Sequence, residues 1–339
     1  MTERVAIAGW GSRIGGGEGI DRAVRSAVRD ALKAADLDSL DAIAMVVTVG
    51  SDLIDGGMVA TRSGIAGSYG RELITVPSSA GHAFAAAMTQ IESGAARHVL
   101  LAGWGQGTKL AARDSRITQA DPFYARPVGA DPTALGLLQA QRLVATGRID
   151  PESMASYAEA MRGRAGHAIS QAPRVGAATW LMPSWCDGAC ALVLTRADAS
   201  GIFVRDFGMA FEPYCPEPDD LDPASWTATA FARMHEPLAQ EELPLAMVET
   251  GAPTPFGEAA AMADILAAQR WPLIDHRFNP SGGGAASHFG PATGLMRIIA
   301  VADFLKRQSA PAIGAALDLA GPIGQATTVM LLEKSRADR

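Results

Sequence analysis

The chain has 339 residues, of which 48% are hydrophobic and 19% charged, a composition typical of a globular protein and unlike that of a disordered one. Its net charge of -7 includes no basic block, and aromatic residues make up only 6%, so no nucleic-acid-binding surface is indicated. No apolar run approaches the roughly 18 residues of a membrane helix and no signal peptide is visible, so we expect a cytoplasmic protein without a membrane partner.

Short β-rich runs alternate with longer helical patterns, the order typical of an α/β fold with a mostly parallel sheet covered by helices. Residues 4–11 predict the first strand. Residues 19–35 predict a helix, because Ala23, Val24 and Val28 have helical spacing. Further strands are predicted at 41–51, 98–105 and 186–195, and further helices at 133–147 and 151–169.

Two segments of the chain resemble each other. AMVVTVG, from Ala44 to Gly50, and AMVETG, from Ala246 to Gly251, each predict a strand that follows a helical stretch and precedes a turn of small residues. The similarity indicates two similar halves. Between residues 108 and 184 the pattern changes to prolines, polar turns and two helices, which indicates an inserted helical segment.

The segment GWGSRIGGGEG follows the first strand and precedes a helix, where a dinucleotide-binding loop would lie. Gly9, Gly11 and Gly15 give the spacing G-x-G-x-x-x-G, which departs from the fingerprint, and the expected acid after the next strand is absent. A nucleotide-binding oxidoreductase is therefore disfavoured, and a glycine-rich surface turn is favoured.

Three cysteines, Cys186, Cys190 and Cys215, leave one unpaired in any disulfide scheme. The segment CDGAC lacks a second Cys or His pair at zinc spacing, so we expect buried thiols and no metal site.

Two segments contain candidate catalytic side chains. In NPSGGGAASHFGPATG, His288 lies on a glycine-flanked turn before a helix, where a histidine serves as a base, as an oxyanion donor or in a purely structural role. In VPSSAGHAF, Ser78 and Ser79 precede a helix, so each is a candidate N-cap, and a serine nucleophile there requires an activating base.

Four segments together resemble the thiolase superfamily, particularly its lipid-transfer-protein (SCP-x) type, from about Val5 to Glu333. The family's nucleophile turn is followed by Ile-x-x-Gly and a strand ending in glycine, which here are Ile91, Gly94 and Gly103. The other matching segments are WCDGACALVLT, NPSGGGAASHFGPATG and GPIGQATTVMLLE.

The resemblance implies a five-layered αβαβα fold of two similar halves with an inserted helical loop domain. It implies an N-terminal half at 1–107 and 185–197, the inserted loop domain at 108–184, and a C-terminal half at 198–339. It further implies a homodimer that takes a coenzyme A thioester as substrate, with no other cofactor.

The chain departs from the family at its catalytic positions. Alignment without gaps places Pro77 at the acyl-accepting cysteine, and a one-residue shift places Ser78 there. Gly251 and Ala252 occupy the positions of a polar side chain, and Asp318 is the nearest counterpart of the late catalytic cysteine. His288 alone matches, so we do not expect a conventional thiolase with a cysteine acyl-enzyme.

These departures leave alternatives open. The first is an enzyme of lipid metabolism that makes or breaks a carbon-carbon bond in an acyl-CoA through an enolate, as in thiolase-like aldolases, which are lyases that work beside a small OB-fold partner. The second is a non-catalytic subunit that binds acyl-CoA or such a partner. The third is an acyltransferase that uses Ser78.

The inserted segment carries charged and aromatic residues of uncertain role. Its cations, Lys109, Arg113 and Arg116, are interpreted as solvated surface charges, with contact to the phosphates of coenzyme A as the alternative. Tyr124 and Tyr157 are candidate acids for an aldol cleavage, although nothing in the sequence directs them toward the histidine.

Overall fold

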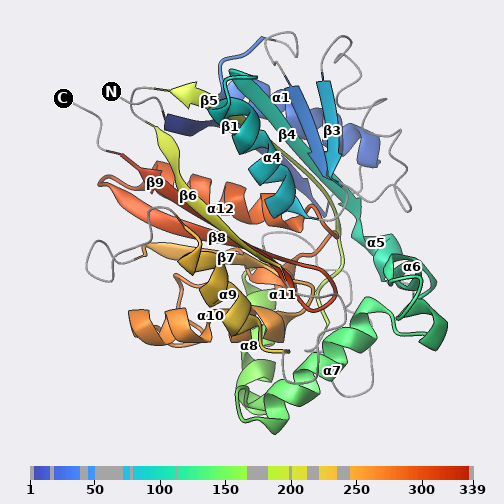
Figure 1. Ribbon diagram of the computed structural model, residues 1–339. Helices are drawn as coiled ribbons and strands as arrows, with labels where there is room; N and C mark the ends of the chain where they lie inside the picture. Colours follow the sequence, from blue (N-terminus) through green and yellow to red (C-terminus); the bar gives the residue numbers. More distant parts are fainter. Residues whose placement is uncertain are drawn as a thin grey trace.

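Figure 1 shows the computed structural model of the chain. It describes residues 4–15, 19–38, 45–49, 72–76, 79–111, 113–165, 182–197, 201–211, 221–234 and 245–335.

The described strands form one nine-stranded mixed sheet in the order β3-β2-β4-β5-β1-β6-β9-β8-β7. Strands β1 and β6 share only the pair Ala6 and Phe203, so the sheet consists of one part from β3 to β1 and another from β6 to β7. The strands are β1 (Arg4–Ile14), β2 (Met45–Val49), β3 (Glu72–Val76), β4 (His98–Gln106), β5 (Asp187–Ala197), β6 (Ile202–Phe211), β7 (Met247–Gly251), β8 (Ala312–Ala320) and β9 (Ala326–Lys334).

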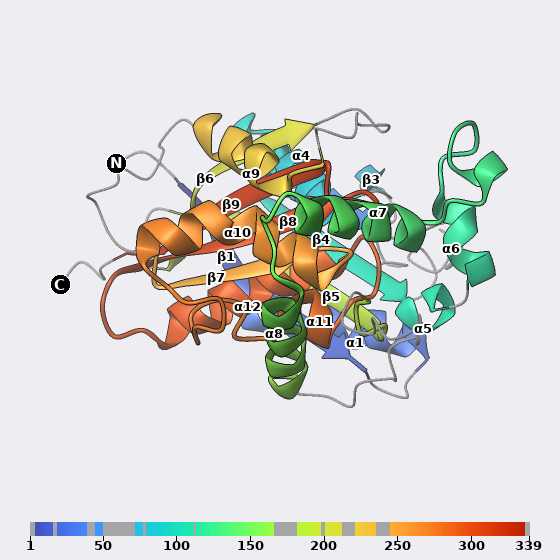
Figure 2. The ribbon, with the colours of Figure 1, turned by 90° about the horizontal axis from the view of Figure 1, so that it is seen from below.

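Helices α4 and α12 lie between the two parts of the sheet, and each contacts strands of both parts. Helix α1 covers the outer face of the first part, and α9 covers β6 and β9 with α10 packed beside it (Figures 1 and 2). The layers therefore run α, β, α, β, α, and the five-layered α/β fold is confirmed. The main helices are α1 (Ile20–Ala34), α4 (Ala80–Glu92), α9 (Pro223–Ala232), α10 (Pro255–Gln269) and α12 (Thr293–Arg307).

Of the remaining helices, α5 to α8 lie along the chain between β4 and β5, two strands of the first part, and α11 precedes α12. Helices α5, α6 and α7 extend away from the sheet, and α8 lies below it in Figure 1. The Gln139 amide of α7 donates hydrogen bonds to the carbonyls of Ile323 at 2.8 Å and Leu221 at 3.3 Å. These helices are α5 (Gly107–Leu110), α6 (Arg113–Gln119), the 3-10 helix η2 (Arg126–Val128), α7 (Pro132–Ala145), α8 (Pro151–Gly163) and α11 (Gly283–Ala286). Within the described residues, none of the helices has both the length and the apolar character needed to span a bilayer.

The alternation of side chains along the strands explains the layers. In β4, Val99 and Leu101 face the middle layer, whereas Leu100 and Trp104 face α1, because successive residues of a strand point to opposite faces. Both sets are apolar, so this strand needs a helix on each side.

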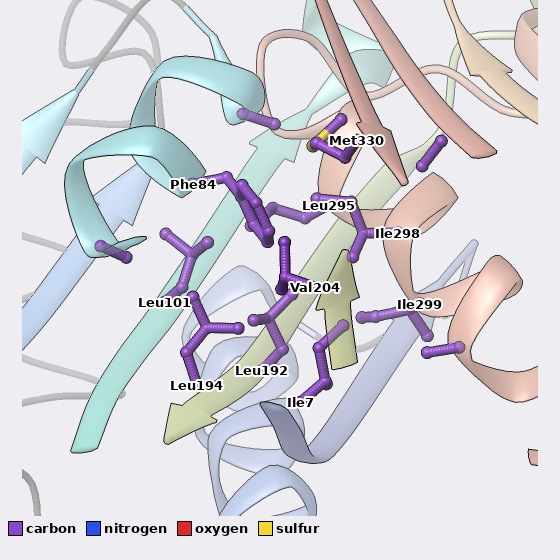
Figure 3. Packing of buried hydrophobic residues seen from close by; sticks show 14 of the residues in the cluster. Ile7, Phe84, Leu101, Leu192, Leu194, Val204, Leu295, Ile298, Ile299 and Met330 are labelled. Atoms are coloured by element: carbon purple, nitrogen blue, oxygen red, sulfur yellow. The ribbon is translucent and has the colours of Figure 1, made fainter. Parts of the chain in front are cut away.

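The middle layer forms the largest core. Figure 3 shows Phe84 of α4 and Leu295 of α12 directed at each other, above Leu101 and Leu192 of the first part of the sheet. The helix after His288, α12, directs Leu295, Ile298, Ile299 and Ala302 into this core. Burial of each such side chain contributes about 1.5–3 kcal/mol, so the middle helices are fixed by packing.

The glycines at the end of the first predicted strand have a different role from either interpretation of the sequence. Gly9 and Gly11 lie within β1 and face α1, and a Cβ atom on Gly9 would lie 2.4 Å from the Ala31 carbonyl oxygen. A Cβ on Gly11 would lie 2.4 Å from the Ala27 carbonyl oxygen. They are neither a phosphate loop nor a surface turn, because their function is to admit the helix backbone.

We predict that Gly9→Ala destabilises the protein by about 3 kcal/mol, because the new methyl group meets backbone atoms that cannot move independently of α1. The measurement is urea unfolding. Gly163→Ala is the matched control, since a Cβ at the last residue of α8 meets nothing within 4 Å. Equal stability of the two variants would contradict the close packing.

Candidate active site

His288 lies between α11 and α12 and is held by the segment before β5. Its backbone N–H donates to the Ser184 carbonyl at 2.9 Å, and its carbonyl accepts from the Cys186 N–H at 3.0 Å. These bonds form a parallel bridge between Trp185 and His288. The backbone of His288 is therefore held by a segment about a hundred residues earlier in the chain.

Glycines at the end of β4 allow this arrangement. A Cβ atom on Gly105 would lie 1.6 Å from the Phe289 carbonyl oxygen, and one on Gly107 would lie 2.6 Å from that of His288. The strand predicted at 98–105 thus ends in glycine because its backbone lies against the segment from Gly284 to Phe289, which is called the histidine turn below.

The His288 imidazole is 9% exposed, and its Nδ1 atom is buried without a hydrogen-bond partner. The Trp185 ring meets it edge-on, with ring centroids 4.9 Å apart. Burial, and then the charge of Arg297, lower the pKa of His288 to about 3. The ring is therefore neutral near pH 7 and a weak base, so its chemistry there is hydrogen-bond donation rather than proton abstraction.

A small cavity of about 20 Å³ lies beside Trp185, between α7 and the loop before α10. Its lining includes Thr254, which is 5% exposed and whose Oγ1 is buried without a partner. A space of this size holds about one water molecule. The family's polar side chain on this loop falls at Gly251 and Ala252, which are buried and have no polar side chain. Thr254, two residues after Ala252, supplies a hydroxyl instead.

The start of α4 is held by a buried acid. Ser79 is the N-cap, as one interpretation of the sequence predicted: its Oγ accepts from the His82 N–H. The same hydroxyl donates to Asp318 Oδ2 at 2.7 Å, and the Gly81 N–H donates to that oxygen at 2.8 Å. Ser78 and Pro77, the two candidates for the cysteine position, lie outside the described residues.

Asp318 also lies against the start of α12. A Cβ atom on Gly294 would lie 2.5 Å from Asp318 Oδ1, so the two middle helices begin at the same carboxyl group. Burial raises the pKa of Asp318 to about 6, although hydrogen bonds from Ser79 and Gly81 lower it. A carboxyl group with this pKa exchanges protons near neutral pH.

The cysteines are poor nucleophiles. Cys186 and Cys190 are buried, and burial raises the pKa of Cys186 to about 11 and that of Cys190 still further. They are therefore the buried thiols that the sequence predicted, while Cys215 lies outside the described residues. Among the residues that the structure describes, no group of three His, Cys, Asp or Glu side chains is placed to hold a metal ion.

A buried polar cluster supports the histidine turn from below. Glu258 of α10 accepts hydrogen bonds from the Gly284 N–H and from the Tyr157 hydroxyl, the latter at 3.2 Å. The Asn279 amide donates to the same hydroxyl at 2.8 Å. Burial raises the pKa of Glu258 to about 8. Tyr157, a candidate acid, is thus fully committed to this cluster and joins α8 to the turn.

The charged residues of the inserted segment differ among themselves. Arg116 is buried and pairs with Asp131 at 3.0 Å, so its interpretation as a solvated charge was wrong. Lys109 and Arg113 are exposed and bond to Gln106 and to a backbone carbonyl. Tyr124 is 69% exposed and has no contact with His288.

Sequence reasoning missed Arg297, Glu258 and Thr254. A charged residue within the apolar run LMRIIAV was a usable signal for Arg297, since an arginine flanked by core residues must find buried partners. The sequence carries no comparable signal for the Thr254 hydroxyl, because threonine before a helix is an ordinary cap.

Comparison with known proteins identifies the fold. No protein-family model matches the sequence, and a search of curated proteins finds no similar one. Among solved structures, the chain matches the Acat5 thiolase from Ascaris suum, crystallised in complex with coenzyme A, with a TM-score of 0.70. The match covers 98% of this chain and 100% of that chain at 16% identity. The chain therefore has the thiolase fold.

We predict that the stability of Asp318→Asn, relative to the native protein, rises by about 2 kcal/mol between pH 4 and pH 7. The folded protein holds the Asp318 proton up to about pH 6, whereas the unfolded chain releases it near 3.8, so the native protein loses stability across that interval. Asparagine keeps the acceptor oxygen and has no such dependence. Urea unfolding of both proteins at the two pH values measures the difference, and a constant difference would contradict the raised pKa.

Proposed function

We propose that this protein acts on an acyl-CoA thioester and makes or breaks a carbon-carbon bond through an enolate, without a cysteine acyl-enzyme. The thiolase fold supports it, together with the coenzyme A bound by the Ascaris suum thiolase of the same fold. The observation that carries the proposal is His288, a buried neutral imidazole with an unpartnered nitrogen, whose ring meets Trp185 at the edge of a small cavity. We also propose that the chain is of the lipid-transfer-protein (SCP-x) type of thiolase and lacks the catalytic cysteines of that type.

The chemistry requires a donor to the thioester oxygen and a base. When the α-carbon loses a proton, its electron pair forms the carbon-carbon double bond of the enolate and negative charge moves to the thioester oxygen. The His288 N–H and a water held by Thr254 donate to that oxygen. Asp318, whose pKa of about 6 exceeds that of His288, accepts the proton. The enolate carbon then bonds to a carbonyl carbon, or the reverse step releases one.

Assembly follows the same proposal. We propose a cytoplasmic homodimer that works with a small OB-fold partner, in which residues 108–184 form an inserted loop domain between two halves. Helices α5 to α8 occupy that part of the chain and contribute Gly136, Leu137 and Thr133 to the cavity beside Trp185.

A second candidate is a non-catalytic subunit that binds acyl-CoA or the partner. The size of the cavity favours it, because about 20 Å³ is far below the roughly 300–1,000 Å³ of ordinary ligand pockets. An acyltransferase that uses Ser78 is the remaining alternative, and a hydroxylamine-labile adduct on Ser78 after incubation with acyl-CoA would establish it over the enolate route.

We predict that the protein, isolated with any subunit that copurifies, incorporates deuterium at the α-carbon of acetyl-CoA or octanoyl-CoA in D2O. His288→Ala should lower the rate by about 100-fold or more, since loss of one oxyanion donor has that effect. Mass spectrometry of the recovered thioester measures the rate without knowledge of the second substrate.

His276→Ala is the matched control, because its side chain is 88% exposed and pairs with Asp275 rather than with a residue of the site. Coenzyme A binding measured by calorimetry, without any deuterium exchange, would reject the enzyme and favour the subunit. Equal rates for the two histidine variants would reject the role of His288.

We predict that Thr254→Val lowers the exchange rate roughly tenfold, the effect of one hydrogen bond, without loss of stability. Valine keeps the shape and removes a hydroxyl that has no protein partner. Thr227→Val is the control: its hydroxyl donates to the Pro223 carbonyl at 2.9 Å, so this variant should lose stability and keep its rate. The opposite pattern would show that Thr254 is structural.

A further inference from the structure

One buried arginine joins the histidine turn to the body of the protein. Arg297 of α12 is fully buried, and its Nη1 donates to Ser281 Oγ at 2.6 Å. Its Nη2 donates to the carbonyl oxygen of Ser287 at 2.7 Å and contacts the hydroxyl of that residue at 3.2 Å. The Ser287 carbonyl belongs to the peptide bond that leads into His288, so the guanidinium grips the backbone directly before the imidazole.

The charge of this arginine is balanced on the side away from the turn. Glu249 of β7 lies 3.8 Å from Nη1 and accepts hydrogen bonds from the Ser281 N–H at 2.7 Å and hydroxyl at 2.6 Å. Burial raises the pKa of Glu249, while Arg297 and Ser281 lower it. Both groups are completely buried, and such an arrangement persists only when each charge has partners.

Other titratable groups lie against the turn. The backbone N–H of Cys186, directly before β5, bonds to the carbonyl of His288, and Glu258 of α10 bonds to the Gly284 N–H at the other end of the turn. Neither supplies a positive charge. After burial, Arg297 is the group that lowers the pKa of His288.

We propose that Arg297 is a positioning residue for His288: it orients the peptide that carries the imidazole and adds to the effect of burial, which keeps the ring neutral and so a donor. This inference rests on the proposed function of the histidine. A purely structural arginine would anchor α12 to the turn and leave the protonation of the ring unchanged, so the two roles are separable by measurement.

The experiment measures protonation at each histidine by hydrogen-deuterium exchange at the imidazole C2 atom, read from peptide masses across pH. It needs no substrate. We expect His288 of the native protein to show no titration above pH 5. In the double variant Glu249→Gln/Arg297→Gln, which removes both buried charges together, the midpoint should rise by about one unit or more.

His82 and His98 are internal controls, because neither contacts Arg297, and unchanged midpoints there show that the fold is intact. A His288 midpoint near 6.5 in the native protein, or one unmoved in the double variant, would overturn the inference. Both outcomes are measured without thioester chemistry, so they are distinguishable from a failure of the proposed function.

Arg297→Lys provides a second measurement if the double variant does not fold. Lysine keeps the charge and loses the two-pronged contact. We expect His288 to remain neutral, and thioester α-proton exchange to lose rate with little change in KM. Full exchange by this variant would show that the contact with Ser287 positions nothing.

Discussion

The carboxyl group of Asp318 is the point on which the middle layer depends. It lies at the end of β8, receives hydrogen bonds from Ser79 and Gly81 at the start of α4, and touches Gly294 at the start of α12. Helix starts present unpaired N–H groups with partial positive charge, so an acceptor there stabilises both helices. The Ala80 N–H also donates to the Pro291 carbonyl at 3.1 Å, so the start of α4 meets the chain three residues after His288.

Burial reverses the order of basicity of Asp318 and His288. In water, histidine is a much stronger base than aspartate. Here the pKa of Asp318 is raised to about 6 and that of His288 is lowered to about 3, so the acid is the better proton acceptor and the imidazole the better neutral donor. In the proposed reaction, this order gives proton transfer to Asp318 and charge stabilisation to His288.

The layered fold was predictable, and the details of the site were not. The order of β-rich runs and helical patterns predicted the α/β class, but the expectation of a mostly parallel sheet was wrong, because the pairings made by β5, β1, β6 and β9 are antiparallel. The predicted role of Gly9 was wrong, because glycine is the residue required both for close packing of a strand against a helix and for a phosphate-binding loop. The bond between Ser79 and Asp318 joins residues 239 positions apart, and the partners of Arg297 also come from other segments. Such contacts depend on tertiary placement, which no local periodicity encodes.

The anchoring of α7 and α8 restricts how a ligand enters. Gln139 bonds to backbone carbonyls of the turn between β8 and β9 and of the segment before α9, and Tyr157 is tied to Glu258 and Asn279. A rigid-body movement of these helices away from the sheet would break these hydrogen bonds. Each buried polar group left without a partner would cost about 1–3 kcal/mol of free energy. In the proposed function, a thioester would therefore enter through local rearrangement where Gly136 packs against Thr254, and the size of this contact would select what passes.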